Sequence, residues 1–133
     1  MPVDNETAQS SWIAYLKSKP QLTALLSSSL QVKETQYQGD QFDYPAVRVA
    51  IDYYPSVNGC GPDDIDVFID VFSAEKSSKE AAHISAVLLS ILQKHPFTQN
   101  GIKYPMVWVK EIKKPVRDIF AWKSCLVIKG LVN

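Results

Sequence analysis

Residues 63–72 of the chain read DDIDVFIDVF, in which aliphatic residues alternate with acidic or aromatic ones. Side chains of an extended strand point to opposite faces with a period of two, and no helix has this period. We therefore predict a strand over Asp63–Phe72 with two chemically different faces. One face carries Ile65, Val67, Ile69 and Val71, and the other carries Asp64, Asp66, Phe68, Asp70 and Phe72.

A long helix is predicted to follow this strand. Ser77 and Glu80 have the spacing of a capping box, and His95-Pro96 favours an end because the residue before a proline avoids the helical region. The apolar residues between these signals recur every three or four positions, which is typical of a buried helix face: Ala81, Ile84, Leu88, Ile91 and Leu92. We expect the aliphatic face of the 63–72 strand to pack against this helix.

The other segments complete a predicted element order of α-α-β-β-β-α-β-β. Trp12, Tyr15 and Leu16 have helical spacing, Asp4 or Asn5 can cap that helix, and Pro20 can begin a second one. The remaining elements are expected as helices over about Glu6–Lys17 and Pro20–Ser27 and strands over Leu30–Tyr37, Tyr44–Tyr53, Ile102–Lys113 and Ile119–Leu131, with Lys114–Asp118 joining the last two. A chain of 133 residues fits one domain, 1–133. The order predicts an α+β class, with a mixed or antiparallel sheet packed against helices.

The charge balance argues against a nucleic-acid-binding protein. Fourteen basic residues oppose 14 acidic ones, for a formal net charge of zero. Proteins that bind phosphates usually carry a basic surplus or a basic stripe. The closest approach to such a patch is Lys110, Lys113, Lys114 and Arg117, which we interpret as the solvated end of a hairpin.

The cysteines and the N-terminal sequence indicate the cellular environment in which the chain is expected. Cys60 and Cys125 are too few for a disulfide framework and lack the spacing of a zinc motif. We expect Cys125 in the core and Cys60 in a Gly-flanked loop, in a reduced, intracellular environment. The sequence begins without a signal-peptide pattern and contains no apolar run long enough to span a bilayer.

One catalytic pattern can be aligned with the sequence. Pro62-Asp63 and Glu111-Ile112-Lys113 match the loose PD…(D/E)xK pattern of metal-dependent nucleases, whose carboxylates converge on a divalent cation. The pattern is short, and a whole strand and helix separate its two halves. Because the surrounding charge is not basic either, we disfavour a nuclease.

Metal-binding spacings are also weak. His83 and His95 have no partner at metal-ligand spacing. Asp64, Asp66 and Asp70 share one strand face, but alternate positions on a strand stand about 7 Å apart, too far for one ion without other ligands. We predict that the protein is not an enzyme and that it has neither a cofactor nor a metal site.

Several local sequences, in their order, resemble a known family. They are the segment from Pro20 to Leu25, YPAVRVAI (Tyr44–Ile51), IDVFIDVFS (Ile65–Ser73), EAAHISAVLLSIL (Glu80–Leu92) and a closing SCLVIKGLV. Together they resemble the tail-terminator, or tail-completion, proteins of long-tailed double-stranded DNA phages, from about Trp12 to Val132. The family is defined by a pattern of elements and hydrophobic positions and has no catalytic motif.

The resemblance implies a structural virion protein, made in the host cytoplasm and located in the phage tail or neck. Such proteins form a hexameric ring at the head-proximal end of the tail, which terminates tail-tube polymerisation and joins the tail to the head. The implied partners are other copies of the chain, the tail tube protein and the neck or head-completion (stopper) protein. DNA passes through the lumen without specific binding. The alternatives are another phage neck, tube or baseplate ring component and, less favoured, the nuclease.

Two groups of residues are candidate functional sites. The loop from Tyr53 to Pro62 is longer than a simple strand connection requires and carries aromatic residues, which are favoured at protein contacts. We expect Tyr53, Tyr54 and Val57 to contact a neighbouring subunit or another virion protein. We also expect Asp64, Asp66 and Asp70 to form a negative surface facing the channel.

Overall fold

The computed structural model describes residues 4–26, 31–34, 44–56, 62–117 and 121–132. Its helices and strands follow the order α-α-β-β-β-α and then four strands, two of them very short. Their bounds are α1 Asn5–Lys17, α2 Pro20–Thr23, β1 Val32–Glu34, β2 Ala46–Tyr54, β3 Asp63–Ser73, α3 Lys79–Leu92, β4 Phe97–Gln99, β5 Ile102–Tyr104, β6 Met106–Arg117 and β7 Trp122–Val132. None of the described helices is long and apolar enough to cross a membrane.

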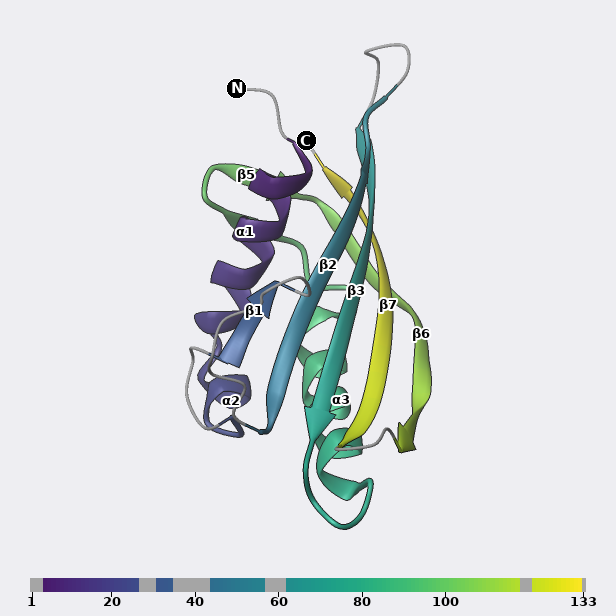
Figure 1. The fold of residues 1–133 in the computed structure, drawn as a ribbon. Coiled ribbons are helices and arrows are strands. Elements are labelled where there is room, and N and C mark those ends of the chain that lie inside the picture. Colours follow the sequence, from purple (N-terminus) through teal and green to yellow (C-terminus); the bar gives the residue numbers. More distant parts are fainter. Residues whose placement is uncertain (1–3, 27–30, 35–43, 57–61, 118–120, 133) are drawn as a thin grey trace.

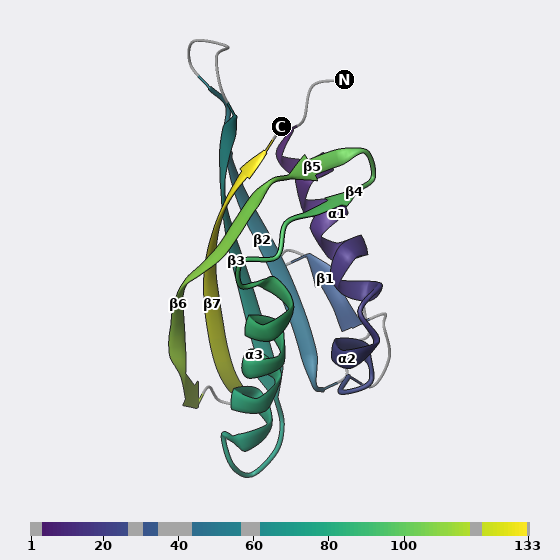
Figure 2. The ribbon, with the colours of Figure 1, turned by 180° about the vertical axis from the view of Figure 1, so that it is seen from behind.

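A five-stranded mixed sheet organises the domain. Its strand order is β1-β2-β3-β7-β6, with β1 parallel to β2 and every other pair antiparallel. The helices α1 and α3 lie on the same face of this sheet (Figures 1 and 2). The predicted α+β class, with its sheet packed against helices, is therefore confirmed.

The central strand β3 has the two faces that its sequence predicts. Ile65, Val67, Ile69 and Val71 are at most 1% exposed and lie in the core cluster beneath the helices. Residues of α3 complete the same cluster, as predicted: Ala81, Ile84, Leu88, Ile91 and Leu92. Burial of each aliphatic side chain of this size contributes about 1.5–3 kcal/mol, so the alternating strand contributes much of the core.

The helix α1 begins at a capped end, as predicted. The Asp4 carboxylate accepts a hydrogen bond of 2.7 Å from the Thr7 backbone N–H. On its buried side, the Trp12 ring packs edge-on against Phe97 and Tyr104, at centroid distances of 5.1 and 5.6 Å. Tyr15 stacks on Phe97 at 3.7 Å. We call these four rings the aromatic cluster.

The partners of α1 in the aromatic cluster come from a small hairpin that the sequence analysis missed. β4 and β5 pair antiparallel around Asn100 and Gly101, whose φ angles are 54° and 77°. Asn-Gly is the preferred pair for such a tight turn, because both positions need positive φ. The predicted strand Ile102–Lys113 is thus two strands, interrupted at Pro105, and β6 continues through Lys114 and Pro115 to Arg117.

The capping box predicted for α3 is wrong. Ser78 is the N-cap residue, and it makes no side-chain capping bond. The Glu80 carboxylate instead accepts a hydrogen bond of 2.7 Å from the Ser73 hydroxyl at the end of β3. Glu80 therefore ties the helix start to the sheet. The helix ends at Leu92, earlier than the predicted His95-Pro96 boundary.

Candidate interaction surface

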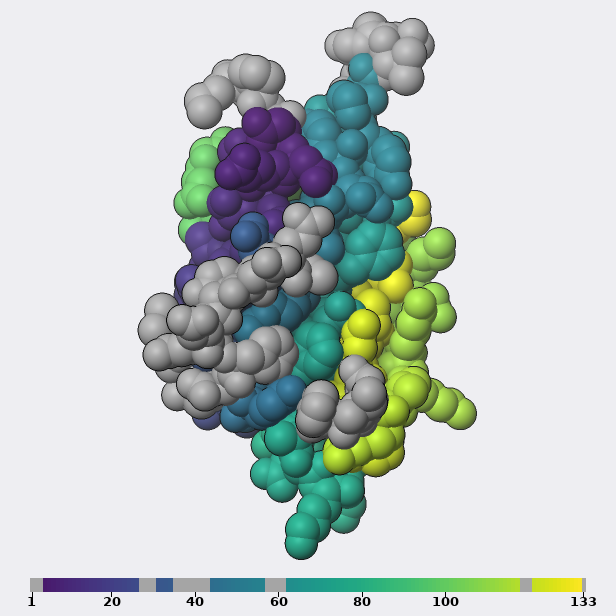
Figure 3. All heavy atoms as spheres, in the orientation of Figure 1, coloured from purple at the N-terminus to yellow at the C-terminus, as the bar shows by residue number. Residues whose placement is uncertain are grey.

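The sheet face opposite the helices is the largest candidate surface, and we call it the outer face. On β3 it carries Asp64, Asp66, Phe68, Asp70 and Phe72, which are half-buried except for the exposed Asp64. Atoms of β3 and β7 are visible on this side of the molecule, in teal and yellow (Figure 3). The register places Lys129, Val127, Cys125 and Lys123 of β7 opposite Asp66, Phe68, Asp70 and Phe72.

The acidic row of β3 is balanced by lysines of β7. Lys129 Nζ lies 3.1 Å from Asp66 Oδ1, and Lys123 Nζ lies 3.8 Å from Asp70 Oδ2. Lys123 also lies 5.8 Å from the centre of the Phe72 ring. The outer face therefore carries both signs of charge. The ion pairs between β3 and β7 could not be predicted from the sequence of either strand alone. Whether Asp64, Asp66 and Asp70 face a channel stays a prediction.

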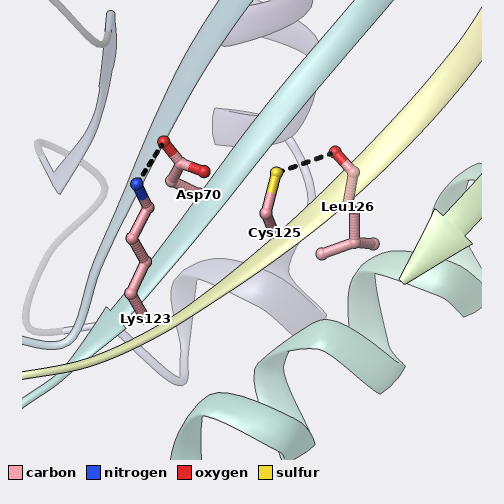
Figure 4. A network of polar contacts seen from close by, with 4 residues as sticks. All are labelled: Asp70, Lys123, Cys125 and Leu126. Carbon is pink, nitrogen blue, oxygen red and sulfur yellow. Dashed lines mark hydrogen bonds and ion pairs between the residues drawn. The ribbon is translucent and has the colours of Figure 1, made fainter. Parts of the chain in front are cut away.

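Cys125 lies on the outer face, contrary to the core position expected from its apolar neighbours. Figure 4 shows its thiol beside the Asp70–Lys123 pair, with Sγ 3.8 Å from the Leu126 carbonyl oxygen. Burial of the thiol, followed by the nearby Asp70 carboxylate, raises its pKa to about 11. A thiol with such a pKa is protonated and weakly nucleophilic at neutral pH. Cys60 lies outside the described residues.

The end of the β2–β3 hairpin is held together by Asp63. Its carboxylate accepts a hydrogen bond from the Tyr53 hydroxyl and a second one, of 2.6 Å, from the Ser56 backbone N–H. These two bonds lower the pKa of Asp63, the Tyr53 bond having the larger effect. Burial, and then Asp63, raises the pKa of Tyr53. Each carboxylate oxygen of Asp63 therefore accepts a hydrogen bond from the β2 side of the hairpin.

The three predicted loop contacts have different environments. Tyr53 is partly buried and packs against the core, whereas the neighbouring Tyr54 is 50% exposed. Val57 lies outside the described residues. Of the predicted aromatic pair, Tyr54 is therefore the more exposed side chain, and its contact with a partner stays a prediction.

The residues of the nuclease pattern are not brought together. Asp63 lies opposite Val132 of β7, whereas Glu111 of β6 lies opposite Val127 on the other side of β7. Five residues along a strand correspond to about 17 Å, so these carboxylates cannot share one ion. Among the described residues, no group of three or more His, Cys, Asp or Glu side chains is placed to hold a metal.

The two lateral ends of the sheet differ in length and chemistry. β1 has three residues, whereas β6 has 12 and forms the opposite edge. Met106, Ile112 and Val116 of β6 are 53%, 41% and 65% exposed, and they are three of the five large hydrophobic side chains exposed in the described part of the chain. The strand also carries the basic residues Lys110, Lys113, Lys114 and Arg117.

Comparison with known proteins gives structural neighbours only. No family model matches the sequence, and no curated protein sequence matches it. A chain in the solved structure "Virion of native gene transfer agent (GTA) particle" has the same fold, with a TM-score of 0.73 and 16% identity over 93% of this chain and 92% of that chain. A second solved chain, 9% identical, has a TM-score of 0.64 over 99% of this chain and 97% of its own length.

These two neighbours share the architecture of the whole domain. Each alignment covers more than nine-tenths of both chains, so the similarity includes the helical layer and the sheet rather than one motif. At such low sequence identity, the similarity establishes the fold alone.

Proposed function

We propose that this protein is a structural component of a phage-like virion, namely the ring at the head-proximal end of the tail. In this role it terminates tail-tube polymerisation and joins the tail to the head or neck. The observation that carries the proposal is the fold shared, over nearly the whole chain, with a protein of a gene transfer agent virion. The resemblance of the ordered sequence segments to tail-terminator proteins supports the specific position.

The surface chemistry is consistent with assembly rather than catalysis. Of the large hydrophobic side chains exposed in the described part of the chain, Met106, Ile112 and Val116 lie along the edge strand β6, whereas Tyr44 and Tyr54 lie near opposite ends of β2. Exposed apolar and aromatic side chains of this kind are favoured at protein–protein contacts. The outer face, with its paired charges, presents no strong positive field that would retain DNA.

Labelling of assembled particles tests the proposed position. Antibody raised against the purified protein is applied to particles from the producing strain, and the label is located by negative-stain electron microscopy. We expect label at the junction of head and tail, and unjoined heads with tails of irregular length when the gene is deleted. Restoring the gene on a plasmid should restore joined particles.

Other results would overturn the position or the class. Label at the far end of the tail would assign the protein to the baseplate, and label along the tail would assign it to the tube. Normal joined particles from the deletion strain, without label anywhere, would rule out the proposed function.

A further inference from the structure

The edge strand β6 is only partly covered by its own chain. The Lys94 backbone N–H donates to the Val107 carbonyl at 3.0 Å, and the Val109 N–H donates to the Gln93 side-chain oxygen at 2.6 Å. These bonds come from the end of α3 and cover the first part of the strand. From Lys110 to Lys114, every side chain is exposed.

This edge combines positive charge with apolar groups. Within Met106–Arg117 there are four basic residues and one acidic residue, Glu111. Ile112 and Val116 are exposed among them. The edge therefore favours an acidic partner surface that also offers some apolar area.

Such a surface lies at the other lateral end of the same sheet. A hollow of about 440 Å³ lies where α1 meets β1 and β2, and its lining includes Glu6, Glu34 and Asp52. An adjoining hollow shares Asp52 and adds Asp4 and the exposed Tyr54. No described basic residue lines either hollow. The Gln9 side-chain amide holds Glu34 in place with a hydrogen bond of 3.1 Å.

We propose that the β6 edge of one copy docks against the α1–β1–β2 end of the next copy, with Lys113 and Lys114 facing Glu34 and Asp52. The two surfaces lie at opposite ends of one sheet (Figure 1), so the contact is head-to-tail. A head-to-tail contact repeated through a closing rotation generates a ring. This inference rests on the proposed ring and names the interface that builds it.

Protection of the β6 edge against unwanted strand pairing is the alternative explanation of its basic residues, and it accounts for fewer of the observed features than the proposed contact does. Lysines, a proline and register shifts all limit uncontrolled pairing of an edge strand, and β6 has each of them, including Pro115 and two register shifts against β7. These features favour a contact through side chains over a continuous added strand. Edge protection, however, requires no acidic counterpart at the opposite end of the sheet.

Two charge-reversed variants test the contact. The edge variant is Lys113→Glu with Lys114→Glu, and the hollow variant is Glu34→Lys with Asp52→Lys. All four side chains are exposed, so both variants are expected to keep the circular dichroism spectrum and melting temperature of the unmodified protein. Sedimentation velocity then measures self-association up to the highest soluble concentration.

We expect the unmodified protein to associate and each variant alone to associate roughly a hundredfold more weakly, because like charges then meet at the contact. An equimolar mixture should recover association. In the mixture, the acidic edge of the edge variant meets the basic hollow of the hollow variant. The basic edge of the hollow variant meets the acidic hollow of the edge variant, as in the unmodified protein. Such an alternating assembly closes in a ring with an even number of subunits, including six.

The control is Lys79→Glu with Lys103→Glu, which makes the same charge change at exposed sites on α3 and β5 and should associate normally. Absence of association by the unmodified protein overturns the inference. Normal association by the edge variant also overturns it, because Lys113 and Lys114 would then only protect the strand edge. A mixture of the two variants that stays dissociated overturns it as well. If antibody label lies at the head–tail junction and any of these results is also obtained, the proposed function stands and only this interface is rejected.

Discussion

Asp66 of β3 and Lys129 of β7 are cross-strand partners whose charged atoms lie 3.1 Å apart on the outer face. Four positions along the same pair of strands, Asp70 and Cys125 are partners, and Lys123 reaches Asp70 from the adjacent position on that face. The side chains of both lysines are more than 40% exposed. Solvent therefore screens both ion pairs.

The first prediction concerns the strength of this pairing. Asp66→Asn should lower the free energy of unfolding by at most about 1 kcal/mol, because exposed ion pairs contribute little. A double-mutant cycle with Lys129→Met, measured by urea denaturation, should give a coupling of about 0.2–1 kcal/mol. Asp64→Asn serves as the exposed control. A coupling of several kcal/mol would mean that the isolated protein already shields this face from water.

The second prediction distinguishes the two faces of the sheet. Val67 is 0% exposed, so Val67→Asp buries an unpaired carboxylate and should abolish soluble expression. Val127→Asp makes the same change on the outer face, opposite Phe68, and should remain soluble and folded. The measurement is the soluble fraction on expression, followed by circular dichroism. A folded Val67→Asp protein would contradict the assignment of the faces.

These faces were predictable because β3 carries both in one alternating sequence. The Asn100-Gly101 pair was also a strong local signal for the β4–β5 hairpin, although this hairpin was not predicted. Glu80 could not be assigned from spacing, because its actual partner, Ser73, belongs to the preceding strand. A local pattern predicts a local bond, and it fails where the tertiary structure offers a competing donor.

The third prediction concerns a buried hydroxyl pair between α1 and β5. The Ser11 hydroxyl donates to the Ala8 carbonyl at 2.7 Å, so Tyr104, whose oxygen lies 2.5 Å away, is the donor to Ser11. Tyr104→Phe loses one bond and should cost about 0.5–1.5 kcal/mol. Ser11→Ala leaves the buried tyrosine hydroxyl without its acceptor and should cost more, about 1–3 kcal/mol.

Chemical denaturation of both variants measures this difference. The order of the two costs is the decisive quantity, because both variants are otherwise small changes at one contact. If Tyr104→Phe proves the more damaging, the tyrosine hydroxyl has a further role in the core.

The fourth prediction is a pH effect at Cys125. The folded thiol has its pKa raised to about 11 from a value of 9.0, so the folded state retains its proton longer than the unfolded state does. The corresponding stability is fully present below pH 9 and is lost as the pH rises to about 11. Cys125→Ala should therefore flatten the fall of the melting temperature between these pH values.

Thiolate absorbance measures the same shift directly. In a Cys60→Ser background, the thiolate of the folded protein should appear near pH 11, and Asp70→Asn should move its pKa down by less than unfolding does, because burial is the larger cause. A thiol that titrates near 9 in the folded protein would contradict the environment described for Cys125.

The fifth prediction concerns the hairpin end and rests on the proposed function. Tyr54 is half-exposed, so Tyr54→Ala should leave the melting temperature unchanged while reducing the yield of joined particles from a complemented deletion strain. Thr98→Ala, at an exposed position on β4, is the control and should complement fully. Normal complementation by Tyr54→Ala would remove this side chain from the assembly contacts.

The sequence predicted the fold better than it predicted the candidate interaction surface. The sequence identifies Asp66 and Lys129 as polar positions on two strands, but their pairing depends on a register set by about 60 intervening residues. The basic residues of β6 resembled a solvated hairpin end because neither the edge position of the strand nor the acidic hollow is a local property. Sheet order creates both features, and sheet order is a tertiary property.

The aromatic cluster also determines when the N-terminal helix can acquire its native surroundings. Trp12 and Tyr15 pack on Phe97, and Trp12 also packs on Tyr104. During synthesis, α1 leaves the ribosome long before Phe97 and Tyr104 do. The contact forms only when the long chain segment between α1 and β4 brings its two ends together. A chain that stops after α3 therefore lacks Phe97 and Tyr104, the two rings on which the aromatic side chains of its first helix pack.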